Sequence, residues 1–385
     1  MIPYGRQSID QHDIDAVVEV LTSDFLTQGP KVPLFEKAVA EMVGAKHGVA
    51  MNSATSALHV ACMALGLGPG DRLWTSPVTF VASANCGLYC GAIVDFVDID
   101  PQTYNMCPKA LRTKLELARS ADCLPKIVIP VHLAGQSCDM SAIGELSREF
   151  GFRIIEDASH AIGATFENRC VGSAAYSDIV IFSFHPVKII TTAEGGMAVT
   201  QSAELARKME YLRSHGVTRD PGLMIGESHG PWYYQQIDLG YNYRMTELQA
   251  ALGLSQTTRL AEFVARRQAL AKAYDEALAE LPLILPYQDR RTRSSFHLYI
   301  IRVPSRPGHR NHSEVFAFLR AAGIGVNLHY IPVHLQPYYA NLGFRPGDFP
   351  VAEAYYSQAI SIPLFAGMTD ADQSEVISAL RDALV

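Results

Sequence analysis

Strand-like and helix-like segments alternate through about 150 residues of this chain, a pattern typical of βα units stacked into a parallel sheet. The strand-like segments are short apolar runs, as expected of strands buried on both faces. They cover residues 48–51, 72–75, 92–97, 127–131, 153–156, 179–184 and 197–199. We therefore predict an α/β fold built on a large, mostly parallel seven-stranded sheet. Ligands of such sheets bind in the crevice outside the carboxyl ends of the strands.

The segments between these strands carry apolar residues at helical spacing. Helices are expected at 10–22, 34–43, 56–65, 140–150 and 204–212. Beyond residue 245 a long helical pattern runs from Thr246, which can cap it, to about Leu281, where Pro282 ends it. Two strands, at 297–303 and 325–330, and two helices, at 314–322 and 370–384, follow. We predict a large domain over 1–245, and a linking helix with a smaller C-terminal α+β domain over 246–385.

The composition is that of an ordinary globular protein, with 48% hydrophobic and 18% charged residues. A net charge of −7 provides no basic surface for nucleic acid. No apolar run reaches the length needed to span a membrane, and the first residues lack the apolar core of a signal peptide, so we expect a cytoplasmic protein. Seven cysteines without a C-x-x-C pair argue against structural zinc and against a disulfide framework. We therefore expect no metal site.

Lys188 lies in the loop that follows the strand at 179–184, just beyond Pro186. A lysine between two buried strands is unusual, because lysine is rarely buried without a partner. Taken alone, Lys188 is most simply a solvated surface residue. The alternative is an amine that loses its water, has a lowered pKa and forms a Schiff base with an aldehyde.

Side chains that could bind a ligand also follow other strands of the predicted sheet. Residues 52–59 place hydroxyl side chains at the start of a helix, where free N–H groups attract a phosphate, although a simple helix cap is the more common reason for this pattern. Phe80 follows the second strand and would either stack on a bound ring or pack in the core. Asp157 lies where the fifth strand gives way to a loop, and there it either caps the next segment or pairs with a cationic ring nitrogen. Ser183 ends the sixth strand.

Together with Lys188, these side chains would suit a single ligand. Hydroxyl and N–H groups fit a phosphate, an aromatic side chain fits a ring face, an acid fits a ring nitrogen and an amine fits an aldehyde. Pyridoxal 5′-phosphate (PLP) carries all four of these groups. The ordinary dinucleotide and P-loop sites are excluded, because no G-x-G-x-x-G follows the first strand and no G-x-x-x-x-G-K-[ST] is present.

Three motifs resemble those of the DegT/DnrJ/EryC1/StrS family of nucleotide-sugar aminotransferases, which are fold-type I PLP enzymes. They are Glu156-Asp157-Ala158, the run Ser-Phe-His-Pro-Val-Lys-Ile-Ile-Thr-Thr-Ala-Glu-Gly-Gly at 183–196, and Gly-Tyr-Asn-Tyr-Arg-Met at 240–245. The resemblance extends from Tyr4 almost to the C-terminus, and residues 23–30, 52–58, 80–85 and 185–190 resemble the pseudaminic-acid branch of the family. It implies a homodimeric transaminase that uses PLP to move an amino group from glutamate to the C4 keto carbon of a UDP-linked 4-keto-6-deoxy amino sugar.

The resemblance also implies roles for individual residues. Lys188 would hold PLP as a Schiff base and Asp157 would pair with the pyridinium nitrogen, which makes these two the catalytic residues. Contacts to the cofactor would come from Ala54, Thr55 and Ser183 at the phosphate, Phe80 at the ring face and His160 beside the phenolic oxygen. Asn242 would reach the phosphate of the neighbouring subunit's PLP, so the active site would need a dimer. Sugar-nucleotide contacts would come from Tyr4, Asp24, Phe25, Leu26, Thr27, Ser183, Tyr243, His329 and Tyr330.

Two residues depart from the family pattern. Ala54 and Ala193 stand where the family commonly has glycine, and Ala193 adds a Cβ where we expect the backbone to take a positive φ. Two rival functions are a dehydratase or epimerase of the same fold, and a non-catalytic PLP- or sugar-binding regulator. Lys188 argues against the first, because some dehydratases of the family have histidine in its place. The sequence does not distinguish altrosamine-, bacillosamine-, perosamine- and arabinose-type acceptors, and it singles out no arginine for the carboxylate of the amino donor.

Overall fold

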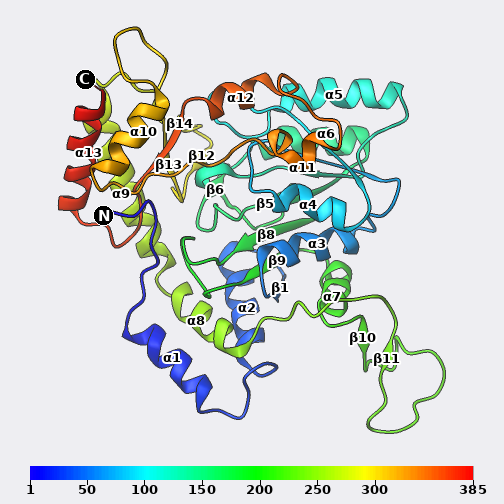
Figure 1. The fold of residues 1–385 in the computed structure, drawn as a ribbon. Helices are drawn as coiled ribbons and strands as arrows, with labels where there is room; N and C mark the ends of the chain where they lie inside the picture. The colour runs from blue at the N-terminus through cyan, green and yellow to red at the C-terminus, as the bar shows by residue number, and fades with distance from the viewer. Residues whose placement is uncertain (385) are drawn as a thin grey trace.

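The computed structural model of the protein describes residues 1–384 and has a seven-stranded sheet at its centre (Figure 1). Its strands are β1 (His47–Met51), β2 (Arg72–Thr75), β3 (Ile93–Phe96), β4 (Ile127–Ile129), β5 (Arg153–Asp157), β8 (Ile179–Ser183) and β9 (Gly196–Thr200). They lie in the order β1-β9-β8-β5-β4-β2-β3. Neighbouring strands from β8 to β3 are parallel, whereas β9 is antiparallel to both β8 and β1. The predicted α/β fold with a large, mostly parallel sheet is confirmed.

Helices cover both faces of this sheet, so the alternating side chains of each strand enter two different cores. The helices are α2 (Lys31–Val43), α3 (Ala54–Ala64), α4 (Ala82–Tyr89), α5 (Pro108–Ser120), α6 (Met140–Phe150) and α7 (Ala203–Leu212). On one face α3, α4 and α7 pack against Leu73 and Ile129, while on the other α5 and α6 pack against Trp74 and Val128. Burial on both sides explains why these strands are apolar along their whole length.

One long helix was expected from Thr246 to about Leu281, but the structure has two helices there, so the prediction of a single continuous helix is wrong. Thr246 caps α8 (Glu247–Thr257) through a capping box with Gln249, as predicted for its first residue, and α9 (Leu260–Leu278) follows after a break. At the break the hydroxyl of Thr258 donates to the carbonyl of Ser255 (2.7 Å), a local bond that competes with the helix. No glycine or proline marks this position, so the apolar spacing alone did not reveal it.

The C-terminal part of the chain builds a further core around two antiparallel strands, β13 (Tyr299–Arg302) and β14 (Ala359–Ile362). Helices α10 (His312–Ala321) and α13 (Asp370–Leu384) pack there, close to their predicted positions. The prediction of a strand at 325–330 is wrong, because within that range only Asn327 makes a strand-like bridge, to Ser361. The partner of β13 is β14, and the segment that includes Asn327 turns into a cavity instead. The domain boundary at 245/246 stays a prediction.

Smaller elements complete the described chain. They are α1 (Gln11–Leu21), β6 (Thr165–Phe166), β7 (Arg169–Cys170), β10 (Val217–Thr218), β11 (Gln235–Gln236), β12 (Thr292–Arg293), α11 (Pro337–Ala340), α12 (Pro350–Tyr356) and 3₁₀ turns at Leu133–Gly135 and Val333–Leu335. The β10–β11 segment projects away from the rest of the molecule (Figure 1). Within residues 1–384, no helix combines the length and the apolar character that crossing a membrane requires.

Candidate active site

Lys188 lies in the loop that joins β8 to β9, at the carboxyl end of β8 as predicted. The loop is held at its base, where the N–H of Phe184 donates to the carbonyl of Gly195 and the N–H of Thr192 donates to the carbonyl of Phe184 (2.9 and 3.0 Å). Burial lowers the pKa of Lys188 to about 8, and the nearby Asp157 carboxylate offsets part of this effect. The lowered pKa increases the fraction of Lys188 that is an uncharged amine near neutral pH, the form that nucleophilic attack on an aldehyde requires.

The end of this loop needs an unusual backbone. Ala193 has a φ of 64°, which confirms the expected positive φ, and its N–H donates to the hydroxyl of Thr191 (3.0 Å). Gly196 lies against the start of α3, where a Cβ would come within 2.4 Å of the Ala54 nitrogen. Glycine is therefore required here, because it lets β9 approach the first turn of α3.

A cavity of about 540 Å³ lies beside Lys188 and contains most of the predicted site. The predicted residues that line it are Tyr4, Ala54, Thr55, Phe80, Asp157, His160, Ser183, Lys188, His329 and Tyr330. They come from the N-terminal segment, the ends of β8, β5 and their neighbours, and the C-terminal part of the chain. The structure thus brings Lys188 and Asp157 to one cavity.

One end of the cavity is suited to an anion. Ser53 caps α3 by accepting from the N–H of Ser56, which leaves the N–H groups of Ala54 and Thr55 without an acceptor in the described chain. Ser183 lines the same cavity with its hydroxyl close to the backbone N–H of His185 (3.5 Å). Free N–H groups at a helix start, together with the helix dipole, favour a phosphate.

Asp157 is almost fully buried, with 5% of its surface exposed, and its carboxylate is held in place by two donors. The hydroxyl of Ser83 donates to one oxygen (2.6 Å), and the N–H of Ser159 donates to the other (3.1 Å). The hydroxyls of Ser83 and Thr79 are also hydrogen-bonded to each other (2.8 Å). This arrangement fixes the carboxylate as a rigid acceptor at the carboxyl end of β5.

His160 is buried, and its hydrogen bonds define its tautomer. The N–H of Ala134 donates to Nδ1 (3.2 Å), so Nε2 carries the proton and donates to the hydroxyl of Tyr330 (3.1 Å). Burial and the nearby Lys188 amine lower the pKa of His160 well below its ordinary value, which keeps the ring neutral. The ring of His297 packs on His160, with 4.4 Å between ring centroids.

These features fit PLP. The free N–H groups of Ala54 and Thr55 suit its phosphate, and the Phe80 ring, 59% exposed, offers an open face to its ring. The buried Asp157 carboxylate suits a protonated ring nitrogen and Lys188 suits its aldehyde. A buried nitrogen of the cavity wall, Nδ1 of His297, has no hydrogen-bond partner within residues 1–384, as expected where a ligand or water completes the site.

The family model described as "DegT/DnrJ/EryC1/StrS aminotransferase family" matches residues 7–381. The chain belongs to this family. It is 42% identical over 384 residues to the spore coat polysaccharide biosynthesis protein SpsC of Bacillus subtilis, covering 99% of this chain and 96% of that protein. It is 37% identical over 387 residues to GDP-perosamine synthase of Caulobacter vibrioides, covering 100% and 98%.

Comparison with solved structures also places the chain among sugar aminotransferases. PseC of Helicobacter pylori, an aminotransferase involved in the biosynthesis of pseudoaminic acid, superposes with a TM-score of 0.90 at 30% identity, covering 100% of this chain and 99% of PseC. The sugar aminotransferase Spr1654 of Streptococcus pneumoniae, in its pyridoxamine phosphate (PMP) form, superposes with a TM-score of 0.89 at 30% identity, covering 100% and 99%. The protein is a PLP-dependent sugar aminotransferase with the fold-type I architecture predicted from its sequence.

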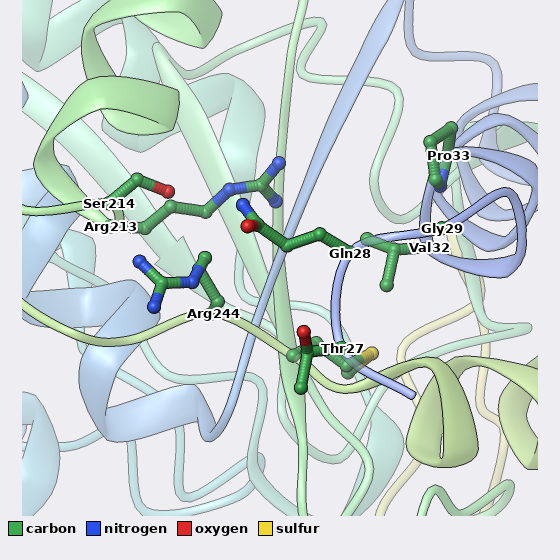
Figure 2. Close-up of a pocket in the computed structure, with 9 residues that line it drawn as sticks. Thr27, Gln28, Gly29, Val32, Pro33, Arg213, Ser214 and Arg244 are labelled. Carbon is green, nitrogen blue, oxygen red and sulfur yellow. The ribbon is translucent and has the colours of Figure 1, made fainter. Parts of the chain in front are cut away.

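The aminotransferase has a second cavity, of about 330 Å³, on another part of the chain (Figure 2). Thr27 and Gln28 lie on one side of it and the guanidinium groups of Arg213 and Arg244 on the other (Figure 2). Arg213 is paired with Glu36 and donates to the carbonyl of Ala50 (2.6 Å). The Arg244 guanidinium has no hydrogen bond or ion pair within residues 1–384 and is free to bind an anion.

Several residues expected at the active site lie outside the Lys188 cavity. They are Asp24, Phe25, Leu26, Thr27, Asn242 and Tyr243. Phe25 and Leu26 are about half exposed, Asn242 is exposed, and the Tyr243 hydroxyl lies 3.3 Å from Nδ1 of His59. Within one subunit these residues do not meet Lys188. Their assignment to the site stays a prediction, and it needs a second subunit.

Sequence reasoning missed several residues of the site. Ser83 orients Asp157 and could have been noticed as a hydroxyl soon after Phe80, but only the structure shows which carboxylate it contacts. His297 and Asn327 line the cavity from the C-terminal part, where one was assigned to a strand and the other to a strand that does not form. Arg244 belongs to the motif at 240–245, yet nothing in the sequence shows that its guanidinium has no partner among residues 1–384.

Proposed function

We propose that this aminotransferase moves an amino group from glutamate to the C4 keto carbon of a UDP-linked 4-keto-6-deoxy N-acetyl sugar. The product would be UDP-4-amino-4,6-dideoxy-N-acetyl-β-L-altrosamine, for pseudaminic acid synthesis. The observation that carries the reaction type is the cavity shared by Lys188 and Asp157, with free N–H groups at the start of α3. The similarity to PseC along the whole chain supports the choice of sugar.

The catalytic work divides among a few side chains. PLP, when bound, supplies an electron-accepting ring. Lys188 would hold its aldehyde and, once displaced by an amine, would carry a proton between the substrate carbon and the cofactor carbon as general base and then general acid. Asp157, fixed by Ser83 and Ser159, would keep a proton on the ring nitrogen. The Nε2 proton of His160 is donated to Tyr330, which positions that hydroxyl at the cavity wall.

We infer that the active enzyme is a homodimer whose sites are shared between subunits. Asn242 and Arg244 lie on a segment with exposed polar groups, and Arg244 has no hydrogen-bond or ion-pair partner within residues 1–384. From the neighbouring subunit, Asn242 would reach the cofactor phosphate, and the Arg244 guanidinium would provide a cation for a substrate carboxylate or phosphate. Thr27 lines the same cavity as Arg244, which supports the assignment of residues 24–27 to the sugar nucleotide.

A second candidate function is the amination of a different acceptor, a nucleotide-linked 4-keto sugar of the perosamine, bacillosamine or 4-amino-arabinose type. The observation that favours it is the higher identity to SpsC and to GDP-perosamine synthase, at 42% and 37%, than the 30% to PseC. These acceptors would use the same Lys188 and Asp157. They would differ in contacts to sugar hydroxyls and to the nucleotide base.

The experiment that separates these candidates is a product screen. The purified enzyme is incubated with PLP, glutamate and a panel of UDP-, dTDP- and GDP-linked 4-keto-6-deoxy sugars, and the products are identified by mass and NMR. The proposal expects the UDP-linked N-acetyl sugar of the altrosamine precursor to be aminated at C4 with the highest kcat/KM. Preference for a GDP-linked sugar by more than tenfold would instead select the second candidate.

A glutamate half-reaction tests the rival of a non-catalytic regulator. When glutamate is added alone, the PLP spectrum should change to that of PMP, with one equivalent of 2-oxoglutarate released per active site. A protein that binds PLP and leaves glutamate unchanged would be a binding protein. Alanine and aspartate serve as alternative donors for comparison.

A further inference from the structure

The ring of His329 lies between the β13–β14 pair and the Lys188 cavity. His329 lines this cavity, and its Nδ1 lies 2.8 Å from the hydroxyl oxygen of Ser361 on β14. Ser361 is fully buried and does not line the cavity. Its backbone is paired with Asn327, since the N–H of Ser361 donates to the carbonyl of Asn327 (2.8 Å) and the N–H of Asn327 donates to the carbonyl of Ser361 (3.1 Å). The hydroxyl therefore holds the imidazole from the side away from the cavity.

The backbone and the ring face of His329 are also held. Its carbonyl accepts from the hydroxyl of Tyr355, a buried residue of α12 (2.5 Å). The ring of Tyr4, from the N-terminal segment, packs against the imidazole with 5.2 Å between ring centroids. Contacts from three distant parts of the chain thus fix the orientation of His329 before any ligand binds.

The hydrogen bond to Ser361 assigns the tautomer of His329. The Ser361 hydroxyl has no other hydrogen-bond partner within residues 1–384, and a buried hydroxyl proton without an acceptor is unfavourable. Ser361 therefore donates to Nδ1, and the ring proton is on Nε2. Nε2 makes no hydrogen bond within the described chain and is not among its enclosed, unpartnered atoms, so this N–H faces the cavity and can donate to a ligand.

The surroundings of this N–H fit an uncharged oxygen better than a carboxylate. Burial and the nearby Lys188 amine lower the pKa of His329 to about 3, so the ring is neutral near pH 7. The other cavity residues of the same segment are Asn327, Leu328 and Tyr330, which are uncharged. A neutral N–H suits a hydroxyl or carbonyl oxygen of a keto sugar, whereas the carboxylates of glutamate form stronger hydrogen bonds with cationic donors.

We propose that Ser361 is a positioning residue for the sugar acceptor, because it fixes the His329 ring so that the Nε2 proton is donated to an oxygen of the keto sugar. Ser361 does not touch the sugar and acts only through His329. The inference rests on the proposed function and adds to it the residue that orients one binding group for the acceptor. Glutamate does not use this donor, so only the half-reaction with the sugar depends on Ser361.

The test measures the two half-reactions separately by single-turnover absorbance. When the PMP form of Ser361→Ala is mixed with the UDP-linked 4-keto-6-deoxy N-acetyl sugar, the apparent dissociation constant of the sugar should rise at least about tenfold, while the rate at saturation should change less than about twofold. The PLP form should react with glutamate with both constants within about twofold of wild type, which also shows that the variant is folded. Ser357→Ala removes an exposed hydroxyl at the end of α12 and is the matched control, unchanged in both half-reactions.

A double-mutant cycle separates positioning from a general loss of packing. His329→Phe should weaken sugar binding at least as much as Ser361→Ala, and adding Ser361→Ala to it should change the dissociation constant by less than about twofold more, because His329 carries the whole effect. Additive effects of the two substitutions would overturn the proposal, and so would an equal loss in the glutamate half-reaction. If the wild-type protein does not react with glutamate at all, the proposed transamination itself is refuted, and this inference with it.

Discussion

At the scale of single residues, the chemistry of this aminotransferase depends on two groups of opposite charge at one cavity, the partly buried amine of Lys188 and the buried carboxylate of Asp157. Burial disfavours the charged form of Lys188, and the Asp157 carboxylate favours it. Burial has the larger effect, so the pKa of the lysine falls to about 8 instead of rising above its ordinary value. Asp157 in turn is satisfied by Ser83 and Ser159, and it does not need Lys188 as an ion-pair partner. The amine is therefore available for covalent chemistry.

Replacing Lys188 tests the assignment of the reactive amine. Lys188→Ala should lower turnover at least about 1,000-fold and remove the absorbance of lysine-bound PLP, because both the covalent attachment and the proton carrier are lost. Lys188→Arg is the matched control, since it keeps a positive charge but cannot attack the aldehyde, and it should be equally inactive. Steady-state rates and absorbance spectra measure both effects. Transamination by the Lys188→Ala protein would refute the assignment.

The pKa of Lys188 predicts how the apoenzyme takes up PLP. The lysine attacks only as a neutral amine, so a pKa lowered to about 8 makes the rate of covalent capture rise as pH increases toward 8 and level off above it. Borohydride trapping at short times, followed by mass spectrometry of the Lys188 peptide, measures this rate between about pH 6 and pH 10. Asp157→Asn should move the inflection to lower pH, because the carboxylate raises the pKa of the lysine. A rate that keeps rising to pH 10 would contradict the lowered pKa.

At the scale of elements, the ends of helices and strands carry the function. The start of α3 presents free N–H groups, and the approach of β9 to that turn requires Gly196. At the start of α2 the free N–H groups find their acceptor in a different way. Its N-cap residue, Pro30, provides no side-chain acceptor, and the buried carboxylate of Glu247 on α8 accepts from the N–H groups of Lys31 and Val32 instead (2.7 and 3.0 Å). The loop before α2 is thereby fixed from a distant part of the chain.

Removing this distant cap tests its contribution to stability. Glu247→Gln should lower the free energy of unfolding by about 1–2 kcal/mol, because it removes the charge that favours a helix N-terminus while it keeps the shape. Glu262→Gln, on an exposed position of α9, should cost less than about 0.5 kcal/mol and is the matched control. Urea unfolding of the PLP-loaded protein measures both values. Equal effects of the two substitutions would contradict a special role for Glu247.

At the scale of the whole molecule, the active site is assembled from distant parts of the chain. The Lys188 cavity takes Tyr4 from the N-terminal segment, Lys188 from the loop between β8 and β9, and Tyr330 from the C-terminal part. The segment that carries Asn242 and Arg244 lies elsewhere, beside the second cavity (Figure 2). A second copy of the chain would be needed to bring this segment to a Lys188 cavity. The dimer proposal therefore predicts that two different inactive variants can restore activity together, whereas subunits with complete sites of their own could not.

Mixing two inactive variants tests whether sites are shared. Lys188→Ala lacks the reactive amine, and Asn242→Asp places a negative charge against the phosphate, so each alone should be nearly inactive. After joint unfolding and refolding in equal amounts, each mixed dimer should contain one site with both native residues, and about a quarter of wild-type activity should return. Activity equal to the average of the two variants would show that each subunit supplies its own complete site.

The sequence by itself determined the α/β fold, the mostly parallel sheet, the family and the positions of Lys188 and Asp157, because apolar periodicity and local motifs are properties of neighbouring residues. It also anticipated the positive φ at Ala193, since the family's glycine marks the backbone conformation at that point. Only the tertiary structure decided that Ser83 holds Asp157 and that α8 and α9 are separate helices. The same holds for the pairing of β13 with β14, and for the Arg244 guanidinium, which has no partner within the described residues. These features depend on contacts between residues far apart in the chain, and no local pattern encodes which distant partner a side chain will meet.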